Sequence, residues 1–136
     1  MRRPLALCCL PLSTLALAAC GTSVSTAGFK GTQHEVAQTV SNLQADATAG
    51  EQGKVCANDL AAALVTRLGG KKGCEAAIKS QLAQVDSLEA GVESVAVAAG
   101  GKTATAQVKS IREGKSRPST VALVAEGGKW KISGLG

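Results

Sequence analysis

Residues 95–109 read Val-Ala-Val-Ala-Ala-Gly-Gly-Lys-Thr-Ala-Thr-Ala-Gln-Val-Lys, and this stretch decides the fold. Its first half alternates valine with alanine, and its second half, 103–109, alternates polar residues with alanine and valine. A period of two residues is typical of a strand with one buried face. Gly100 and Gly101 stand between the halves and supply the backbone freedom that a tight turn needs. The stretch therefore predicts a β-hairpin.

Two further strands are expected after this hairpin. We expect a polar loop over 112–118, a strand over 120–126, and a turn at Gly127-Gly128 that leads into a last strand. Consecutive strands joined by short turns pair antiparallel, so the four strands predict a meander sheet. The strand side chains assigned to the core, or to the lining of a pocket, are Val97, Val108, Leu123, Trp130 and Ile132.

Ahead of the sheet the apolar period changes to that of helices. The first helix begins at Thr32, which forms a capping-box pattern with Glu35, and an apolar stripe follows over 36–47. A second helix is expected over 54–68, where apolar residues recur every four positions, and a third over 74–85. Glycine pairs are typical of the ends of such helices.

Leu64 and Leu82 lie on the apolar faces of the second and third expected helices, so they join the predicted core or pocket lining. Helices followed by a run of hairpin-connected strands predict an α+β domain. We expect three helices packed on one face of a curved antiparallel sheet of about four strands.

The N-terminal segment has the features of an export signal. Arg2 and Arg3 precede an apolar run over 5–19, which is shorter than the roughly 20 residues that a spanning helix needs. Residues 17–20, Leu-Ala-Ala-Cys, end this run and resemble the lipobox of bacterial lipoproteins. An ordinary secretory signal is the alternative. Twin-arginine export is disfavoured because the residues that normally flank the arginine pair are missing.

The lipobox resemblance implies that the chain is cut between Ala19 and Cys20 and that the Cys20 thiol carries a diacylglycerol. It divides the chain into a signal peptide (1–19), a lipidated cysteine with a flexible tether (20–31) and one domain (32–136). The implied location is the extracytoplasmic face of the cell membrane, with the lipid bilayer as a partner. Two or more acyl chains on one residue anchor a protein stably.

Composition limits the functions that this domain can have. The 136-residue chain carries a net charge of +5, and removal of residues 1–19 takes away two basic side chains, which leaves 13 − 10 = +3. There is no Tyr, and Phe29 and Trp130 are the only Phe and Trp. A mildly basic chain without aromatic residues interleaved among its basic ones for base stacking, and expected to be exported from the cell, is not expected to bind nucleic acid. We expect Phe29 to pack on the domain and Trp130 to face the helices.

The cysteines indicate a cross-link. Of the five, Cys8 and Cys9 leave with the signal peptide and Cys20 is used for the lipid, so Cys56 and Cys74 remain. In an exported protein such a pair favours a disulfide. A metal site is the weaker alternative, because two thiols and a single distant histidine do not complete a four-ligand set.

Several of these residues together resemble a known family. Gly50-Glu51, Cys56-Ala57 in a helix, a second cysteine opening the next helix, and a C-terminal Gly-Gly-Lys-Trp-Lys-Ile-Ser-Gly are similar to small actinobacterial lipoproteins and secreted proteins with an NTF2-like (cystatin-like, SnoaL-related) fold. The resemblance covers roughly residues 32–136. It implies a cone-shaped domain, often with an apolar pocket between the helices and the sheet.

Enzymatic activity, cofactors and metals are not expected. NTF2-like enzymes place an acid or a base inside the cone, and the inward strand positions here are Val, Ala, Leu and Ile. His34, the only histidine, is expected to be solvated or to cap a helix, and Asp46, Asp59 and Asp86 are expected on polar helix faces. Two non-enzymatic hypotheses remain: a binding module for a small apolar ligand or an envelope protein, and a scaffold with a filled core; the volume of a pocket distinguishes them. The third alternative, an NTF2-like enzyme, would need a buried polar pair in the cone.

Overall fold

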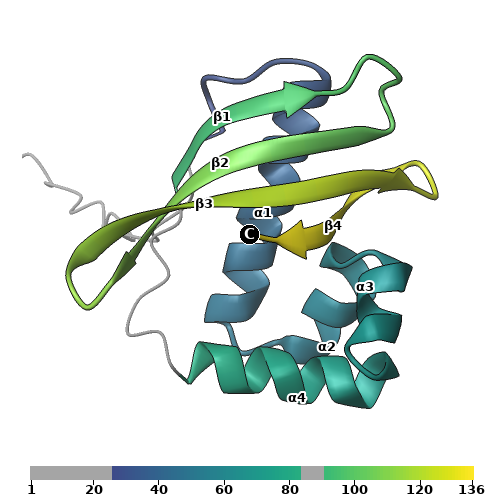
Figure 1. The fold of residues 1–136 in the computed structure, drawn as a ribbon, viewed down its shortest axis with the longest axis vertical. Helices are drawn as coiled ribbons and strands as arrows, with labels where there is room; N and C mark the ends of the chain where they lie inside the picture. The colour runs from purple at the N-terminus through teal and green to yellow at the C-terminus, as the bar shows by residue number, and fades with distance from the viewer. Residues whose placement is uncertain (1–25, 84–90) are drawn as a thin grey trace, which may run out of the picture.

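Four antiparallel strands in the order β1-β2-β3-β4 form the framework of the protein (Figure 1). The computed structural model describes residues 26–83 and 91–136. The strands are β1 (Gly91–Val97), β2 (Thr103–Arg112), β3 (Lys115–Glu126) and β4 (Lys129–Leu135). The helical segments are α1 (Thr32–Thr48), α2 (Gln52–Lys54), the π-helical η1 (Val55–Asp59), α3 (Ala62–Arg67) and α4 (Gly70–Leu82). Helices packed on an open antiparallel sheet confirm the predicted α+β class.

The two predicted glycine turns are confirmed. Gly101 (φ 65°) lies in the turn between β1 and β2, where its N–H donates to the carbonyl of Ala98 at 2.8 Å. Gly127 (φ 59°) and Gly128 (φ 76°) connect β3 to β4. Positive φ values at both central residues match the right-handed twist of the flanking strands.

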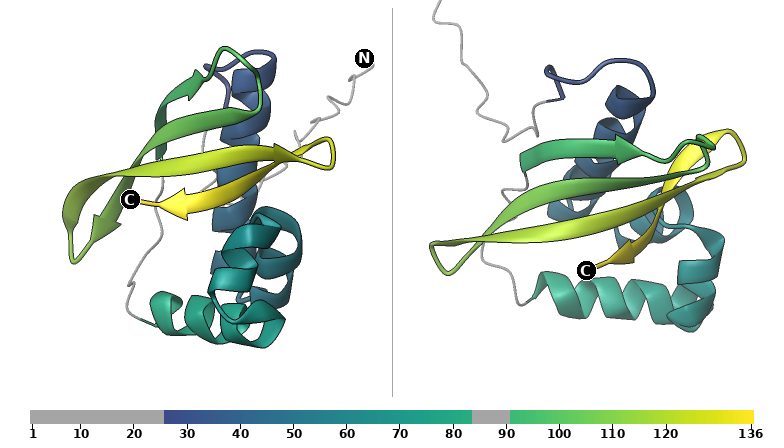
Figure 2. Two further views of the ribbon diagram at one scale, coloured as in Figure 1. Left: turned by 45° about the vertical axis from the view of Figure 1, so that its right-hand side comes forward. Right: turned by 45° about the horizontal axis from the view of Figure 1, so that its top comes forward.

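The prediction of a polar loop over 112–118 is wrong. Strands β2 and β3 stay paired up to Arg112 and Lys115, and the turn consists of Glu113 (φ 51°) and Gly114 (φ 71°). The hairpin therefore projects beyond the helices (Figure 2). Pro118 is tolerated inside β3 because β4 pairs with β3 only from Val121 onward, so at Pro118 the strand is an edge.

The first helix lies across one face of the sheet and packs against β1, β2 and β4 (Figure 2). Val36, Val40 and Ala47 of the predicted apolar stripe are buried, and Leu43 is half-buried. The capping-box prediction is wrong. Gly31 is the N-cap residue, and no side chain caps the first turn.

The second predicted helix is not continuous. After α2 and η1 the chain becomes extended at Leu60, which forms a parallel bridge with Ile132 of β4. The N–H of Ala61 donates to the carbonyl of Ile132 at 2.8 Å before α3 begins. This short segment covers the outer edge of β4, and burying the polar groups of a sheet edge prevents unwanted pairing.

The third predicted helix is present and begins earlier than expected, at Gly70 rather than at Cys74. Helix α4 contacts α2, η1 and α3, so it forms an outer tier of the helical layer (Figure 1). The predicted disulfide joins Cys56 of η1 to Cys74 of α4, with the Cα atoms 6.1 Å apart. The bridge therefore ties this outer tier to the segment that contacts the sheet. The end of the predicted helix, 84–85, lies outside the described residues.

Candidate functional site

The interior between helices and sheet is occupied by the side chains that the sequence assigned to the core or to a pocket. Val108, Leu123, Trp130 and Ile132 are buried, and Leu123 and Ile132 have exposed fractions of 1% and 0%. Half-buried side chains pack against this core, among them Leu64, Leu82, Val97 and Phe29. The expected packing of Phe29 and the inward orientation of Trp130 are therefore confirmed. These residues form a core, and of the predicted pocket residues only Trp130 also borders one of the two hollows described below.

The larger hollow lies outside this core, between α1, η1 and the start of β4. Its volume is about 580 Å³. Polar side chains dominate its wall: Glu35, Gln38, Thr39, Asn42, Ala45 and Asp46 of α1, Asn58 and Asp59 of η1, and Gly128, Lys129 and Trp130 at the other side. We call this feature the polar hollow. It extends along α1 from Glu35 to Asp46, a span of about 16 Å at the rise of an α-helix.

A buried carboxyl group lies in this wall. Asp59 is only 4% exposed, and its Oδ2 atom has no hydrogen-bond partner among the described residues. Burial of Asp59 raises its pKa to about 6, and the negative charge of Asp46 and a hydrogen bond with Asp46 act in the same direction. The positive charge of Lys131 partly opposes this rise. Two close carboxyl groups ionise reluctantly together. Asp59 therefore changes its charge near neutral pH.

Lys131 organises the segment that holds Asp59. Its Nζ atom donates to the carbonyls of Asn58 and of Ala57, the latter at 3.5 Å, at the end of η1. Carbonyl groups at a helix end lack helical partners, and a cation there satisfies them. Lys131 thus reaches around the edge of β4 to fix the residue that precedes Asp59, with its own donors directed at main-chain oxygens.

The π-helical geometry of η1 explains the burial of Asp59. The N–H of Leu60 donates to the carbonyl of Val55, five residues earlier, at 3.1 Å. Such wide turns are rare and occur often at functional sites. The sequence placed Asp59 on the polar face of a continuous α-helix, and this prediction is wrong because the wide turn and the extended Leu60 direct Asp59 toward Asp46. No local sequence signal, such as a glycine or proline within 55–59, marks the change.

The remaining wall of the polar hollow is fixed by hydrogen bonds along α1. The Gln38 amide donates to Asn42 at 3.1 Å, and the Thr39 hydroxyl contacts the carbonyls of Glu35 at 3.1 Å and of Trp130 at 3.5 Å. The contact from Thr39 to Trp130 connects α1 to β4 across one end of the hollow.

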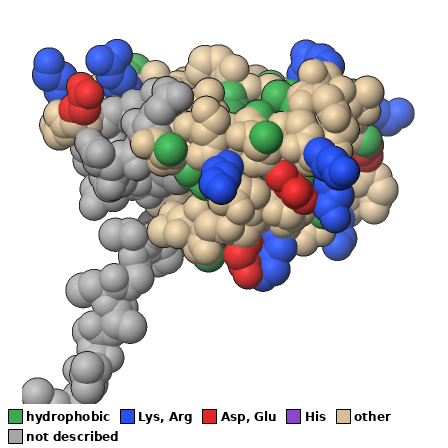
Figure 3. Space-filling model, turned by 90° about the horizontal axis from the view of Figure 1, so that it is seen from below, with side chains coloured by type: hydrophobic (Ala, Val, Ile, Leu, Met, Phe, Trp, Pro, Cys, Tyr) green, Lys and Arg blue, Asp and Glu red, His purple; other side chains and the backbone are tan. Residues whose placement is uncertain are grey.

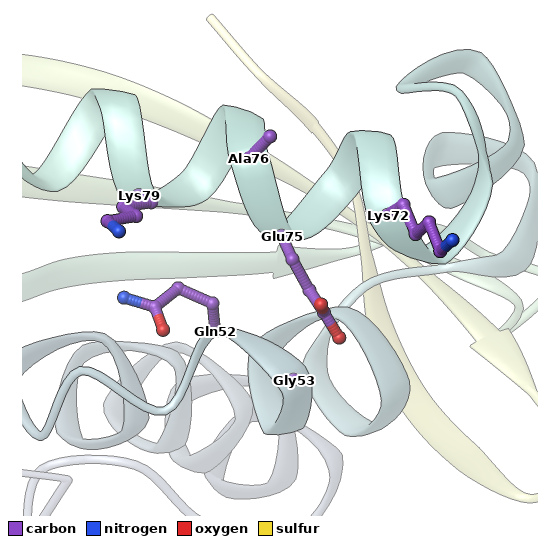
Figure 4. A pocket seen from close by; sticks show the side chains of 6 residues that line it. All are labelled: Gln52, Gly53, Lys72, Glu75, Ala76 and Lys79. Carbon is purple, nitrogen blue, oxygen red and sulfur yellow. The ribbon is translucent and has the colours of Figure 1, made fainter.

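The smaller hollow, of about 440 Å³, lies between α2 and α4 and has a different character. Figure 4 shows the Glu75 side chain reaching toward Gly53, while Gln52 and Lys79 approach each other from opposite sides. Lys71 lies 4.0 Å from Glu75, and both side chains are solvent-accessible. On the lower face of the molecule basic and acidic side chains are mixed, without a broad apolar patch (Figure 3). This hollow lacks a buried ionisable group in its wall.

His34 is not among the residues that line the polar hollow. His34 is exposed, and its Nδ1 atom lies 3.3 Å from the carbonyl of Thr26. The predicted signal peptide, the cleavage site at Ala19, the lipidation site at Cys20 and Asp86 lie outside the described residues.

Two further findings concern the part of the chain that the structure describes. Within residues 26–83 and 91–136 no group of three or more His, Cys, Asp or Glu side chains is arranged to hold a metal ion. Over the same residues no helix has the length and apolar character required to cross a bilayer.

The comparisons with known proteins identify no relative. The chain matches no protein-family model, no curated protein and no solved structure.

Proposed function

We propose that the protein is a lipid-anchored binding module on the extracytoplasmic face of the cell membrane, and that its polar hollow holds a small ligand. The lipobox-like residues 17–20 support the anchor at Cys20. The observation that carries the binding function is the buried Asp59, whose Oδ2 atom lacks a partner among the described residues in the wall of a hollow of about 580 Å³. Small-molecule sites usually have volumes of about 300–1,000 Å³ and a few converging polar groups.

The polarity of this hollow changes the class of ligand that we propose. The sequence favoured a small apolar ligand inside the cone, where Ala106, Leu123 and Ile132 are now seen to be fully packed. The polar hollow lies outside that core, and most of the residues in its wall carry a polar side chain. A polar or charged ligand suits such a wall, because buried polar atoms are stable when they are hydrogen-bonded.

A scaffold without a ligand is the second candidate, and the filled core favours it. Under this hypothesis the domain has a structural role at the membrane, and the polar hollow is only a solvated groove. The helical layer on a four-stranded meander supports the NTF2-like assignment as a proposal. We do not propose catalysis, because the described residues place no histidine beside Asp59; His34 lies about 18 Å from Asp46 along α1.

Native mass spectrometry of the full-length protein, extracted from its own membrane, tests the proposed function. We expect an acylated mass that begins at Cys20 and a ligand adduct that disappears in Asp59→Asn. The control is Glu93→Gln, which removes a surface carboxylate paired with Lys109 at 3.1 Å. An adduct that survives in Asp59→Asn would contradict the assignment of the site, and an unmodified N-terminus elsewhere would contradict the anchor.

A further inference from the structure

We propose that the polar hollow binds an organic cation through a primary ammonium group that is held between the carboxylates of Asp59 and Asp46. This inference rests on the proposed function and names its ligand class. It uses the position of the two carboxyl groups, the charges around them and the aromatic side chain at the end of the hollow.

The Asp59 Oδ2 atom is buried with no donor among the described residues. The cation beside it, Lys131, is directed at the carbonyls of Ala57 and Asn58. A primary ammonium has three donors and no acceptor, so it can donate to this oxygen and to the neighbouring Asp46 carboxylate. Such charge-assisted hydrogen bonds are about twice as strong as neutral ones.

Within its wall the hollow has more carboxyl groups than cationic side chains. The described wall residues include the carboxyl groups of Glu35, Asp46 and Asp59 and one cationic side chain, Lys129. Lys131 and Lys54 lie outside the wall and act electrostatically on Asp59 and Asp46. A wall with excess negative charge attracts cations and disfavours anions, and the effect is stronger in a concave surface.

An organic cation suits the hollow better than a metal ion does. Within the described residues no metal-binding cluster is present, and divalent cations such as Ca²⁺ require six to eight oxygen ligands. Trp130 also borders the hollow, and its indole ring offers apolar surface to the carbon chain of an organic ammonium.

Binding of this cation is expected to depend on pH. The ionised form of Asp59 binds the ammonium, and its pKa of about 6 reflects burial and Asp46, opposed by Lys131. The other charged groups of the wall are Glu35 and Lys129. With that pKa the ionised fraction is about 0.1 at pH 5 and nearly 1 at pH 8, so the dissociation constant is about tenfold larger at pH 5.

The experiment uses the full-length mature protein in detergent micelles and titrates it with n-butylammonium chloride at constant ionic strength. Trp130 is the only Trp and the chain has no Tyr, so the fluorescence comes from a single residue that borders the hollow, and calorimetry gives an independent isotherm. The uncharged probe is n-butanol and the anionic probe is sodium butyrate. Each titration is repeated at pH 5 and pH 8 and with Asp59→Asn, Asp46→Asn and Glu93→Gln.

We expect saturable binding of n-butylammonium at pH 8, about tenfold weaker binding at pH 5, and at least tenfold weaker binding in both aspartate variants, with Glu93→Gln unchanged. Circular dichroism checks that each variant is folded. Saturation by butyrate or n-butanol instead of the cation would overturn the ligand class and leave the proposed binding function intact. If none of the three probes saturates, the ammonium proposal fails. The binding function fails as well only if the native protein also lacks a ligand adduct.

Discussion

The burial of the Asp59 carboxyl group predicts that Asp59→Asn makes the protein more stable at neutral pH. In the native state the Asp59 pKa is about 6, against an ordinary value of 3.8 in the unfolded chain. At about 1.4 kcal/mol per tenfold change in proton affinity, the ionised form destabilises the native state by about 3 kcal/mol. Water in the polar hollow screens part of this penalty, so we expect a gain of about 2 kcal/mol in the free energy of unfolding.

The sign of the pH dependence follows from the same two pKa values. Between pH 3.8 and about 6 the native protein holds a proton on Asp59 that the unfolded chain has released. The stability of the wild-type protein therefore falls as the pH rises through this window. Asp59→Asn does not titrate, so the difference in stability between the two proteins is near zero at pH 3.5 and reaches its full value above pH 7.

Urea unfolding at several pH values between 3.5 and 7.5 measures this difference, with Trp130 fluorescence and circular dichroism as the two probes. Carboxyl groups distant from Asp59 are the same in both proteins, so their contributions cancel in the comparison. Glu93→Gln is the matched control, and because its ion pair with Lys109 is exposed we expect a change of less than about 1 kcal/mol. If the stability difference between the wild type and Asp59→Asn does not vary with pH, an ionised Asp59 is not buried in the native state. The same conclusion follows if Asp59→Asn is less stable than the wild type at pH 7.5.

Three further predictions test the packing. Reduction of the Cys56–Cys74 disulfide, which spans 18 residues, should lower the free energy of unfolding by about 3 kcal/mol; equal urea midpoints with and without reductant would exclude a structural role. Gly73→Ala should lose more than about 2 kcal/mol, because an added Cβ would overlap a backbone carbonyl of the α3–α4 turn, whereas Gly100→Ala, in open space, should melt like the wild type. Trp130→Ala should lose about 3–5 kcal/mol, since the ring is 8% exposed; an unchanged melting temperature would instead indicate a partner contact.

The parts of the fold that were predictable are those that short-range patterns determine. Polar and apolar residues alternate over 103–109 because a strand has two faces. The glycine pair at 127–128 reflects the positive φ values of a hairpin turn. Both are local properties of the chain. The disulfide followed from compartment and cysteine count rather than from geometry. The length of the β2–β3 hairpin was missed because Pro118 usually ends a strand, and only the absence of a β4 partner at that position makes it acceptable.

The break in the second helix could not be predicted, because its cause lies more than seventy residues away along the chain. Apolar residues at 56, 60, 64 and 68 are compatible with a continuous helix and equally with the observed structure. The structure instead makes Leu60 extended so that it bridges Ile132 and covers the edge of β4. Exposed sheet edges are a liability, so tertiary pairing overrides helix periodicity at this position.

The same break creates the candidate site. A continuous α-helix would leave Asp59 on a solvated face, whereas the π-helical turn of η1 places it beside Asp46 with an unpaired oxygen. Natural proteins keep such destabilising groups mainly where function requires them. Asp59→Asn is expected to stabilise the protein and to remove the charge that we propose binds a cation. An ionisable group at position 59 is therefore what the proposed ligand site requires, whereas packing alone would favour Asn.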